Sequence, residues 1–83
     1  MPPQLQQQGW KVKIRDRERV EPPHVTVICK RNSWRYGLRE KAFLDDRPDP
    51  RDVPDALLAE IAAQLDTLRK KWDEMYPENP VGG

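Results

Sequence analysis

Residues 24–39 read HVTVICKRNSWRYGLR, and this stretch decides the fold because apolar and polar residues alternate on both sides of one turn signal. β-Branched residues dominate its first half, as is typical of strands. Asn32-Ser33 then favours a two-residue hairpin turn, because asparagine tolerates a positive φ angle. Alternation resumes from Trp34 to Leu38. The stretch therefore predicts two antiparallel strands, over residues 24–31 and 34–38.

Further strands are predicted on either side of this hairpin. Residues 10–15 alternate between apolar and charged side chains, which is typical of a half-buried strand and predicts a first strand over about residues 10–17. Pro22-Pro23 cannot lie inside a central strand, because two successive residues lack an N–H donor. Residues 42–44 either extend the third strand or form a short fourth one. Residues 1–9, rich in proline and glutamine, are predicted to form a disordered lead.

One long amphipathic helix is predicted from Pro54 to Tyr76. The prolines and acids of residues 45–52 indicate a loop, and Pro54 suits the first turn of the helix that follows. At about 100° per residue, eight apolar side chains share one arc of the helix. They are Leu57, Leu58, Ile61, Leu65, Leu68, Trp72, Met75 and Tyr76. Pro77 ends the helix, and residues 78–83 are expected to form a flexible tail.

Together these elements predict an α+β fold in the order β-β-β-(β)-α. Short connections favour an antiparallel sheet of three or four strands. The apolar sheet face and the apolar stripe of the helix must cover each other, since nothing else in the chain can. Residues 10–77 are therefore expected to form a single domain, with one long C-terminal helix packed on one face of the sheet.

Composition excludes several classes of protein. The chain has 83 residues, enough for one domain, and 36% of them are apolar and 35% charged. No apolar run is long enough to span a membrane, and the first residues lack the pattern of a signal peptide. Cys29 is the one cysteine, so an internal disulfide is excluded; we expect it to be a buried, inert thiol. The expected location is the cytoplasm.

Positive charge gathers in the half of the chain that forms the sheet. Residues 1–40 hold nine basic and four acidic residues, a net charge of +5, whereas residues 41–83 hold six and ten, a net charge of −4. The sheet face opposite the helix is predicted to carry no acid. It comprises Lys11, Lys13, Arg15, His24, Thr26, Ile28, Lys30, Arg35, Gly37 and Arg39. This face is either a plain solvated surface or a binding face for an anionic partner.

Contact with a phosphate backbone is the form of nucleic-acid binding that this face predicts. The candidate residues are Lys11, Lys13, Arg15, Lys30, Arg35 and Arg39. A platform for base stacking is not expected, because Trp10, Trp34, Tyr36 and Trp72 all fall on predicted core faces.

Catalysis has two candidate residues, His24 and Arg35. A histidine that titrates near neutrality and an arginine that stabilises phosphorane charge suit metal-free RNA cleavage. A histidine that packs or hydrogen-bonds locally is the alternative interpretation. His24 and Cys29 would lie on opposite faces of one strand, so they cannot share a metal ion. We therefore assign no catalytic residue, no metal site and no cofactor.

The segment PPHVTV of residues 22–27, after the basic segment KVKIRDRE of residues 11–18, resembles a family of short bacterial proteins of unknown function. That family places a Pro-Pro-His-x-His-Val strand after an N-terminal strand and carries an amphipathic helix that ends in a tryptophan. Some members look like the toxin halves of toxin–antitoxin pairs. The likeness covers residues 11–73. His24 matches the first histidine of the motif, and Thr26 stands in place of the second.

The predicted function is a small binding module whose basic sheet face contacts nucleic acid or an acidic protein. Two alternatives stay open: a metal-free ribonuclease-type toxin of a toxin–antitoxin pair, and an accessory protein that acts through protein contacts only. A helix of about 34 Å would overhang a strand of about 23 Å. We therefore expect self-association through Trp72, Met75 and Tyr76 at the overhang.

Overall fold

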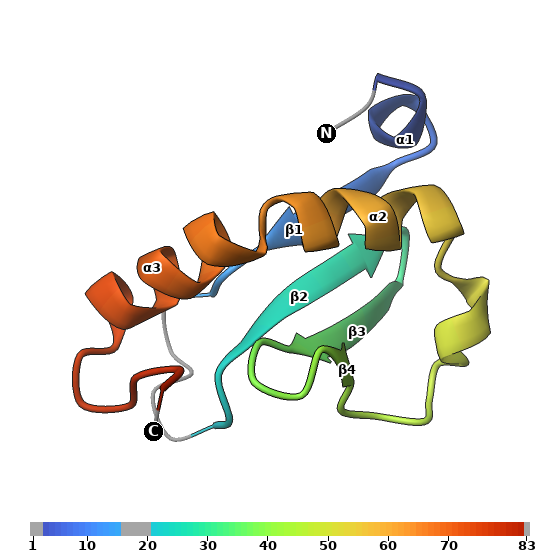
Figure 1. Cartoon of the computed structure of the whole chain (residues 1–83). Helices are drawn as coiled ribbons and strands as arrows, with labels where there is room; N and C mark the ends of the chain where they lie inside the picture. The colour runs from blue at the N-terminus through green and yellow to red at the C-terminus, as the bar shows by residue number, and fades with distance from the viewer. Residues whose placement is uncertain (1–2, 16–20, 83) are drawn as a thin grey trace.

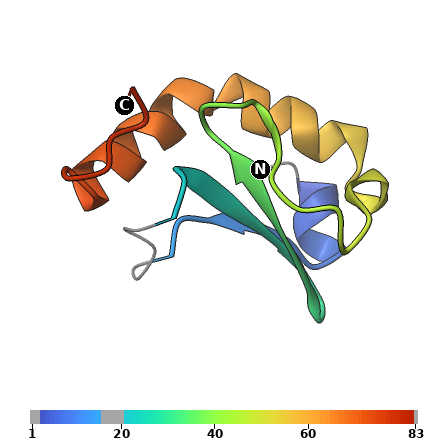
Figure 2. The ribbon, with the colours of Figure 1, turned by 90° about the horizontal axis from the view of Figure 1, so that it is seen from below.

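The computed structural model describes residues 3–15 and 21–82. The strands form one four-stranded antiparallel sheet in the order β1-β2-β3-β4, and the C-terminal helices lie across one of its faces (Figure 1, Figure 2). The predicted α+β fold is therefore confirmed. The elements are α1 (Pro3–Gln7), β1 (Trp10–Lys13), β2 (His24–Cys29), β3 (Asn32–Gly37), β4 (Ala42–Phe43), η1 (Pro50–Asp52), α2 (Asp55–Ala63) and α3 (Leu65–Met75).

The central hairpin turns two residues earlier than predicted. Cys29 pairs with Asn32, so Lys30 and Arg31 form the turn, with Lys30 at a positive φ of 56°. The predicted turn at Asn32-Ser33 is wrong, because both residues belong to β3. The observed register places Trp34, which is 2% exposed, opposite the fully buried Val27. Burial of this large side chain outweighs the local turn preference of asparagine.

The outer strands are short. β1 ends at Lys13 rather than at residue 17, and the predicted continuation over residues 16–17 lies outside the described residues. Residues 42–44, left open by the sequence, contribute the fourth strand: Phe43 pairs with Tyr36 and Ala42 with Gly37.

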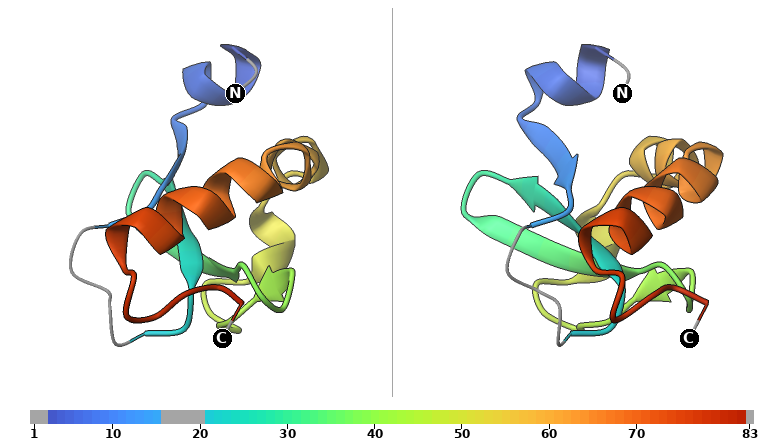
Figure 3. Two further views of the ribbon diagram at one scale, coloured as in Figure 1. Left: turned by 60° about the vertical axis from the view of Figure 1, so that its left-hand side comes forward. Right: turned by 90° about the vertical axis from the view of Figure 1, so that its left-hand side faces the viewer.

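The predicted single helix is in fact two helices, α2 and α3. The chain leaves helical geometry at Gln64, where φ is −107° and ψ is 13°, and the two helices meet at an angle (Figure 3). Because sheets twist, one straight helix of this length cannot follow the sheet surface from end to end. The bend lets α2 bury Leu57 and Ile61 while α3 buries Trp72.

The core has two parts, one under each helix. Under α2, the buried residues are Leu5, Val27, Trp34, Val53, Leu57 and Ile61. Under α3, they are Ile14, Val25, Leu38, Trp72, Tyr76 and Val81. All members of the predicted helical stripe are buried or half-buried. Leu5 lies in α1, so this part of the chain departs from the disordered lead expected for residues 1–9. Cys29 is half-buried rather than buried.

The C-terminal tail folds back beside the sheet, as the views in Figure 3 show. The Trp72 indole N–H donates to the Asn79 carbonyl (2.7 Å), and the Asn79 side-chain amide donates to the Glu21 carbonyl (2.7 Å). The Tyr76 hydroxyl donates to the Arg15 carbonyl. Instead of the flexible tail expected for residues 78–83, residues 79–81 are held by hydrogen bonds and by the burial of Val81.

This tail removes the exposed overhang on which the predicted self-association rests. Trp72 is fully buried and Tyr76 is 4% exposed within their own chain, which leaves only Met75 half-buried. No apolar patch of these three side chains is therefore presented to a partner.

Candidate anion-binding groove

A polar groove of about 460 Å³ lies on the sheet face that points away from the helices. Strand pairing explains its floor, because Thr26 of β2 and Arg35 of β3 are direct cross-strand partners and both line the groove. The loop after β4 and the hairpin turn form its walls. The lining residues are Arg15, Glu21, Thr26, Arg31, Asn32, Ser33, Arg35, Asp45, Arg47 and Pro48.

Arg35 lies at the centre of an ion-pair network in this groove. Its Nε and Nη2 atoms donate to the two carboxylate oxygens of Asp45, at 2.8 and 2.7 Å, and its Nη1 atom donates to Glu21 at 2.9 Å. The hydrogen bonds from Arg35 lower the pKa of the Asp45 carboxyl, and those to Asp45 raise the pKa of the Arg35 guanidinium. Arg35 therefore clamps the segments before β2 and after β4 onto β3.

The prediction that no acid stands at this face is wrong. Glu21 and Asp45 both lie in loops, and the sequence pattern assigns loop acids to solvent rather than to a sheet face. Glu21 and Asp45 contact Arg35 because the loops that carry them fold over this sheet face, and the sequence pattern does not predict the paths of these loops. Burial of an unpaired cation is unfavourable, so carboxylates that approach a half-buried arginine are stabilising.

Three further arginines line the groove, namely Arg15, Arg31 and Arg47, and all three are exposed. Within residues 3–15 and 21–82, no salt bridge involves any of them. The four arginines of the groove face two carboxylates, which leaves a surplus of two positive charges. Guanidinium groups bind phosphate oxygens in pairs of parallel hydrogen bonds, so the groove has the chemistry of an anion site.

The predicted nucleic-acid-binding residues do not all come together. Arg15 and Arg35 line the groove, and Lys11 and Lys13 are exposed on the same side of the sheet in β1. Lys30 is exposed in the hairpin turn. Arg39 is exposed but does not line the groove, and it donates to the Val81 and Pro80 carbonyls of the C-terminal tail, at 2.7 and 2.6 Å; its contact with nucleic acid stays a prediction.

Sequence reasoning missed Arg31 and Arg47. The predicted hairpin turn at residues 32–33 places Arg31 at the end of a strand, whereas the observed register places it in the turn, where it lines the groove. Arg47 lies in the loop of residues 45–52, and no local pattern indicates that this loop folds toward the sheet face.

His24 is fully buried, which separates it from the groove surface. Its Nδ1 atom donates to the Pro22 carbonyl (2.8 Å), and its ring centroid lies 5.5 Å from that of Trp72. A base that moves protons of a substrate must reach it through at most one water. The geometry therefore favours the local-packing interpretation of His24 over a catalytic role with Arg35.

Aromatic rings gather on the side of the sheet that faces the helices. Trp10 packs against Trp34 and Tyr36 against Phe43, with ring centroids 5.5 and 5.3 Å apart. None of these rings lines the polar groove. Among the described residues, no group of three or more histidine, cysteine, aspartate or glutamate side chains is placed to hold a metal ion, and no helix is long and apolar enough to cross a membrane.

Comparison of the chain with family models, curated proteins and solved structures finds no match. The resemblance drawn from residues 22–27 therefore stays an expectation.

Proposed function

We propose that this chain is a small cytoplasmic binding module that holds the phosphate backbone of single-stranded nucleic acid in the arginine groove. The observation that carries the proposal is the convergence of Arg15, Arg31, Arg35 and Arg47 on one polar groove at the sheet face left open by the helices. Neutralisation of phosphates by such cations releases counterions and supplies affinity that does not depend on sequence.

The size and lining of the groove favour a single strand with little sequence preference. A volume of about 460 Å³ is that of a site for a small ligand, so it suits one or two nucleotides rather than a duplex. Base edges carry the sequence information, and the groove offers no aromatic ring that would hold an unstacked base in place for its edge to be read. Lys11 and Lys13, next to the groove on β1, add positive potential along the approach.

The test is a titration of fluorescently labelled single-stranded RNA and DNA, followed by anisotropy at low salt and then at rising salt. We expect binding of both, with a log–log salt slope of about −0.7 for each neutralised phosphate, and thus about −1.4 to −2.1 for two or three phosphates. Arg31→Glu/Arg47→Glu should abolish binding. Lys70→Glu/Lys71→Glu, an equal charge change on exposed α3 residues, is the matched control.

Two outcomes would overturn the proposal: no binding at low salt, or unchanged binding by the groove variant. Poly-glutamate that binds where RNA does not would assign the groove to an acidic protein partner. Slow cleavage of the labelled RNA that disappears in His24→Ala would favour the ribonuclease alternative.

A further inference from the structure

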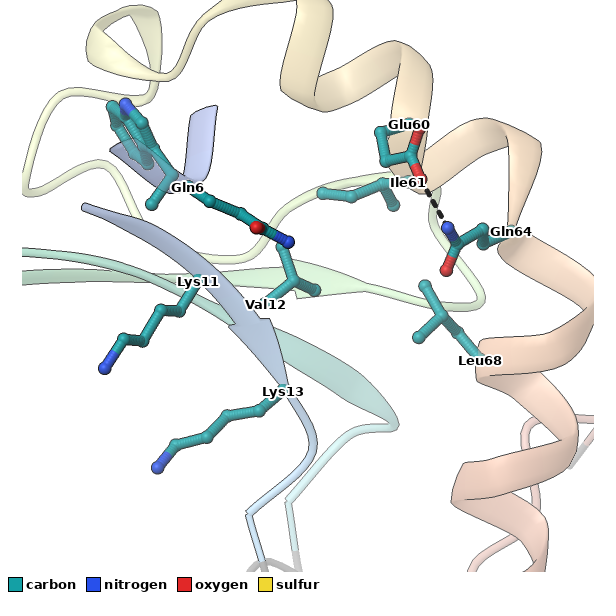
Figure 4. A pocket seen from close by; sticks show the side chains of 9 residues that line it. Gln6, Lys11, Val12, Lys13, Glu60, Ile61, Gln64 and Leu68 are labelled. Atoms are coloured by element: carbon teal, nitrogen blue, oxygen red, sulfur yellow. Dashed lines mark hydrogen bonds between the residues drawn. The ribbon is translucent and has the colours of Figure 1, made fainter. Parts of the chain in front are cut away.

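A second groove, of about 630 Å³, runs between β1 and the junction of α2 and α3. Figure 4 shows Val12, Ile61 and Leu68 pointing toward one another across it, whereas Lys11 and Lys13 point away from the helices. This apolar groove shares no lining residue with the arginine groove. Val12 and Leu68 are half-buried, so part of their apolar surface remains open.

β1 borders the apolar groove and is an edge strand. In an antiparallel sheet, alternate residues of a strand direct their N–H and C=O groups to opposite sides. The Leu38 N–H donates to the Pro23 carbonyl, so odd-numbered residues of β2 bond to β3 and even-numbered ones to β1. Lys11 and Lys13, which pair with Ile28 and Thr26, therefore bond to β2.

The main chain of Val12 consequently points outward. Over residues 3–15 and 21–82, no strand pairs with this outer side of β1. An outward N–H and C=O beside an open apolar groove is the arrangement that accepts an added strand from another chain.

The register fixes what an added strand must carry. Its residue opposite Val12 shares the face of Val12, so that side chain enters the apolar groove. The residues before and after it lie on the other face, beside Lys11 and Lys13. An apolar residue between two acidic residues matches both faces. The Glu60 carboxylate, which accepts a hydrogen bond from Gln64, lines the groove on the helix side (Figure 4). An acidic residue opposite Val12 would therefore meet a like charge, which favours an apolar residue at that position.

A second copy of this chain does not match. Antiparallel pairing of two β1 strands about Val12 would place the Lys11 of each copy opposite the Lys13 of the other. Like charges directly opposite each other across two strands are destabilising. The same two lysines that repel a second β1 attract an acidic strand.

We propose that β1 binds an extended segment of a partner protein with the pattern acid–apolar–acid, which adds to the sheet as a further strand. The segment hydrogen-bonds to the Val12 main chain, packs its apolar residue against the Val12 and Leu68 side chains, and pairs its acids with Lys11 and Lys13. This interaction goes beyond the binding of nucleic acid in the arginine groove and uses a different groove and the outer edge of β1, while Lys11 and Lys13 contribute positive charge to both.

The test compares two labelled ten-residue peptides, one alternating glutamate and valine and the other lysine and valine. We expect the glutamate peptide to bind by anisotropy, with affinity that falls as salt rises, and the lysine peptide not to bind. Amide hydrogen exchange should slow at Val12 when the glutamate peptide is present, because its N–H acquires an acceptor. Sedimentation without peptide should show a monomer.

Val12→Pro is the sharpest variant, because it removes the outward N–H and leaves the bonds of Lys11 and Lys13 to β2 in place. It should weaken peptide binding about tenfold or more and leave RNA binding unchanged. If circular dichroism shows that this variant does not fold, Lys11→Glu/Lys13→Glu carries the test. It should weaken binding of the glutamate peptide about tenfold and allow the lysine peptide to bind. Lys70→Glu/Lys71→Glu is the control.

Three results would overturn the proposal. The first is that the glutamate peptide does not bind, and the second is that it binds without protection of the Val12 amide. The third is that it binds Val12→Pro, or Lys11→Glu/Lys13→Glu where that variant replaces it, as tightly as the unaltered chain. A dimer with a protected Val12 amide in the absence of peptide would assign the edge to a second copy instead. Loss of RNA binding alone would affect only the function proposed for the arginine groove.

Discussion

Replacement of Asp45 by asparagine tests two effects of the acids in the arginine groove: they stabilise the fold through Arg35, and they lower the positive charge offered to a ligand. Asp45 accepts two hydrogen bonds from one edge of the Arg35 guanidinium, at 2.8 and 2.7 Å. Asparagine has nearly the same size, but it is neutral and presents an amide N–H₂ group to one of those donors. Asp45→Asn should therefore lower stability and raise the affinity for a polyanion.

The stability effect is small because water screens the pair. The Arg35 and Asp45 side chains are 35% and 36% exposed, so the pair contributes no more than about 1 kcal/mol to the free energy of unfolding. In a domain of this size, 1 kcal/mol corresponds to a fall in Tm of about 4–8 °C, which a thermal melt followed by circular dichroism resolves.

The affinity effect has the opposite sign. Loss of the Asp45 charge raises the positive surplus of the groove and leaves one edge of Arg35 open to phosphate. Unit charges about 4 Å apart in water interact by about 1 kcal/mol, so the binding of single-stranded RNA should tighten by about three- to fivefold. Weaker RNA binding by Asp45→Asn in the anisotropy assay would refute the placement of the ligand at Arg35.

Acid should remove the stability difference between the unaltered chain and Asp45→Asn. Arg35 lowers the pKa of Asp45 below its ordinary value of 3.8, so the pair contributes fully above that value and is lost as the pH falls through the folded-state pKa. Urea unfolding at neutral pH should therefore separate the two proteins. The difference should shrink as the pH falls below 3.8. A difference that persists unchanged in acid would show that the pair does not stabilise the fold.

Two further substitutions test the packing that positions these surfaces. Leu57 is fully buried under α2, so Leu57→Ala should cost about 2–4 kcal/mol, measured as a lower urea midpoint; an unchanged midpoint would show that α2 does not dock through this residue. Arg39→Ala removes the donors to the Val81 and Pro80 carbonyls, so exchange of the tail amides should accelerate, with a loss of about 1–2 kcal/mol. Tail amides as protected as those in the control Lys71→Ala would contradict the anchoring role of Arg39.

The elements that follow from residue spacing could be predicted from the sequence. Alternation in residues 24–27 predicts Val25 and Val27 on the covered face, and the helical spacing of Leu57, Ile61 and Trp72 predicts them in the core; all five are buried. These patterns depend only on the geometry of one element at a time. A strand of two residues carries too little periodicity for the sequence to decide whether β4 forms.

The features that sequence reasoning missed depend on contacts between elements. The hairpin turn lies two residues earlier than predicted because this register packs Trp34 under α2. The helix ends at Gln64 because the two halves of its apolar stripe pack on different parts of a twisted sheet. Neither cause is visible within the local sequence. The asparagine turn preference and the unbroken apolar arc were both genuine local signals, and in each case tertiary packing outweighed them.

The charge of a sheet face cannot be read from the strands alone, and Arg35 shows why. The sequence predicts that Arg35 contacts nucleic acid, but in the structure its guanidinium donates hydrogen bonds to Glu21, which precedes β2, and to Asp45, which follows β4. Its main contribution is therefore to position the groove walls, including the loop that carries Arg47. Glutamate at position 35 would gather three carboxylates at one point and disturb the walls as well as the charge. Substitution of the exposed Arg31 and Arg47 changes the charge of the groove and leaves its walls in place. Variants at these two positions, which strand alternation does not identify, are therefore the ones that test what the groove binds.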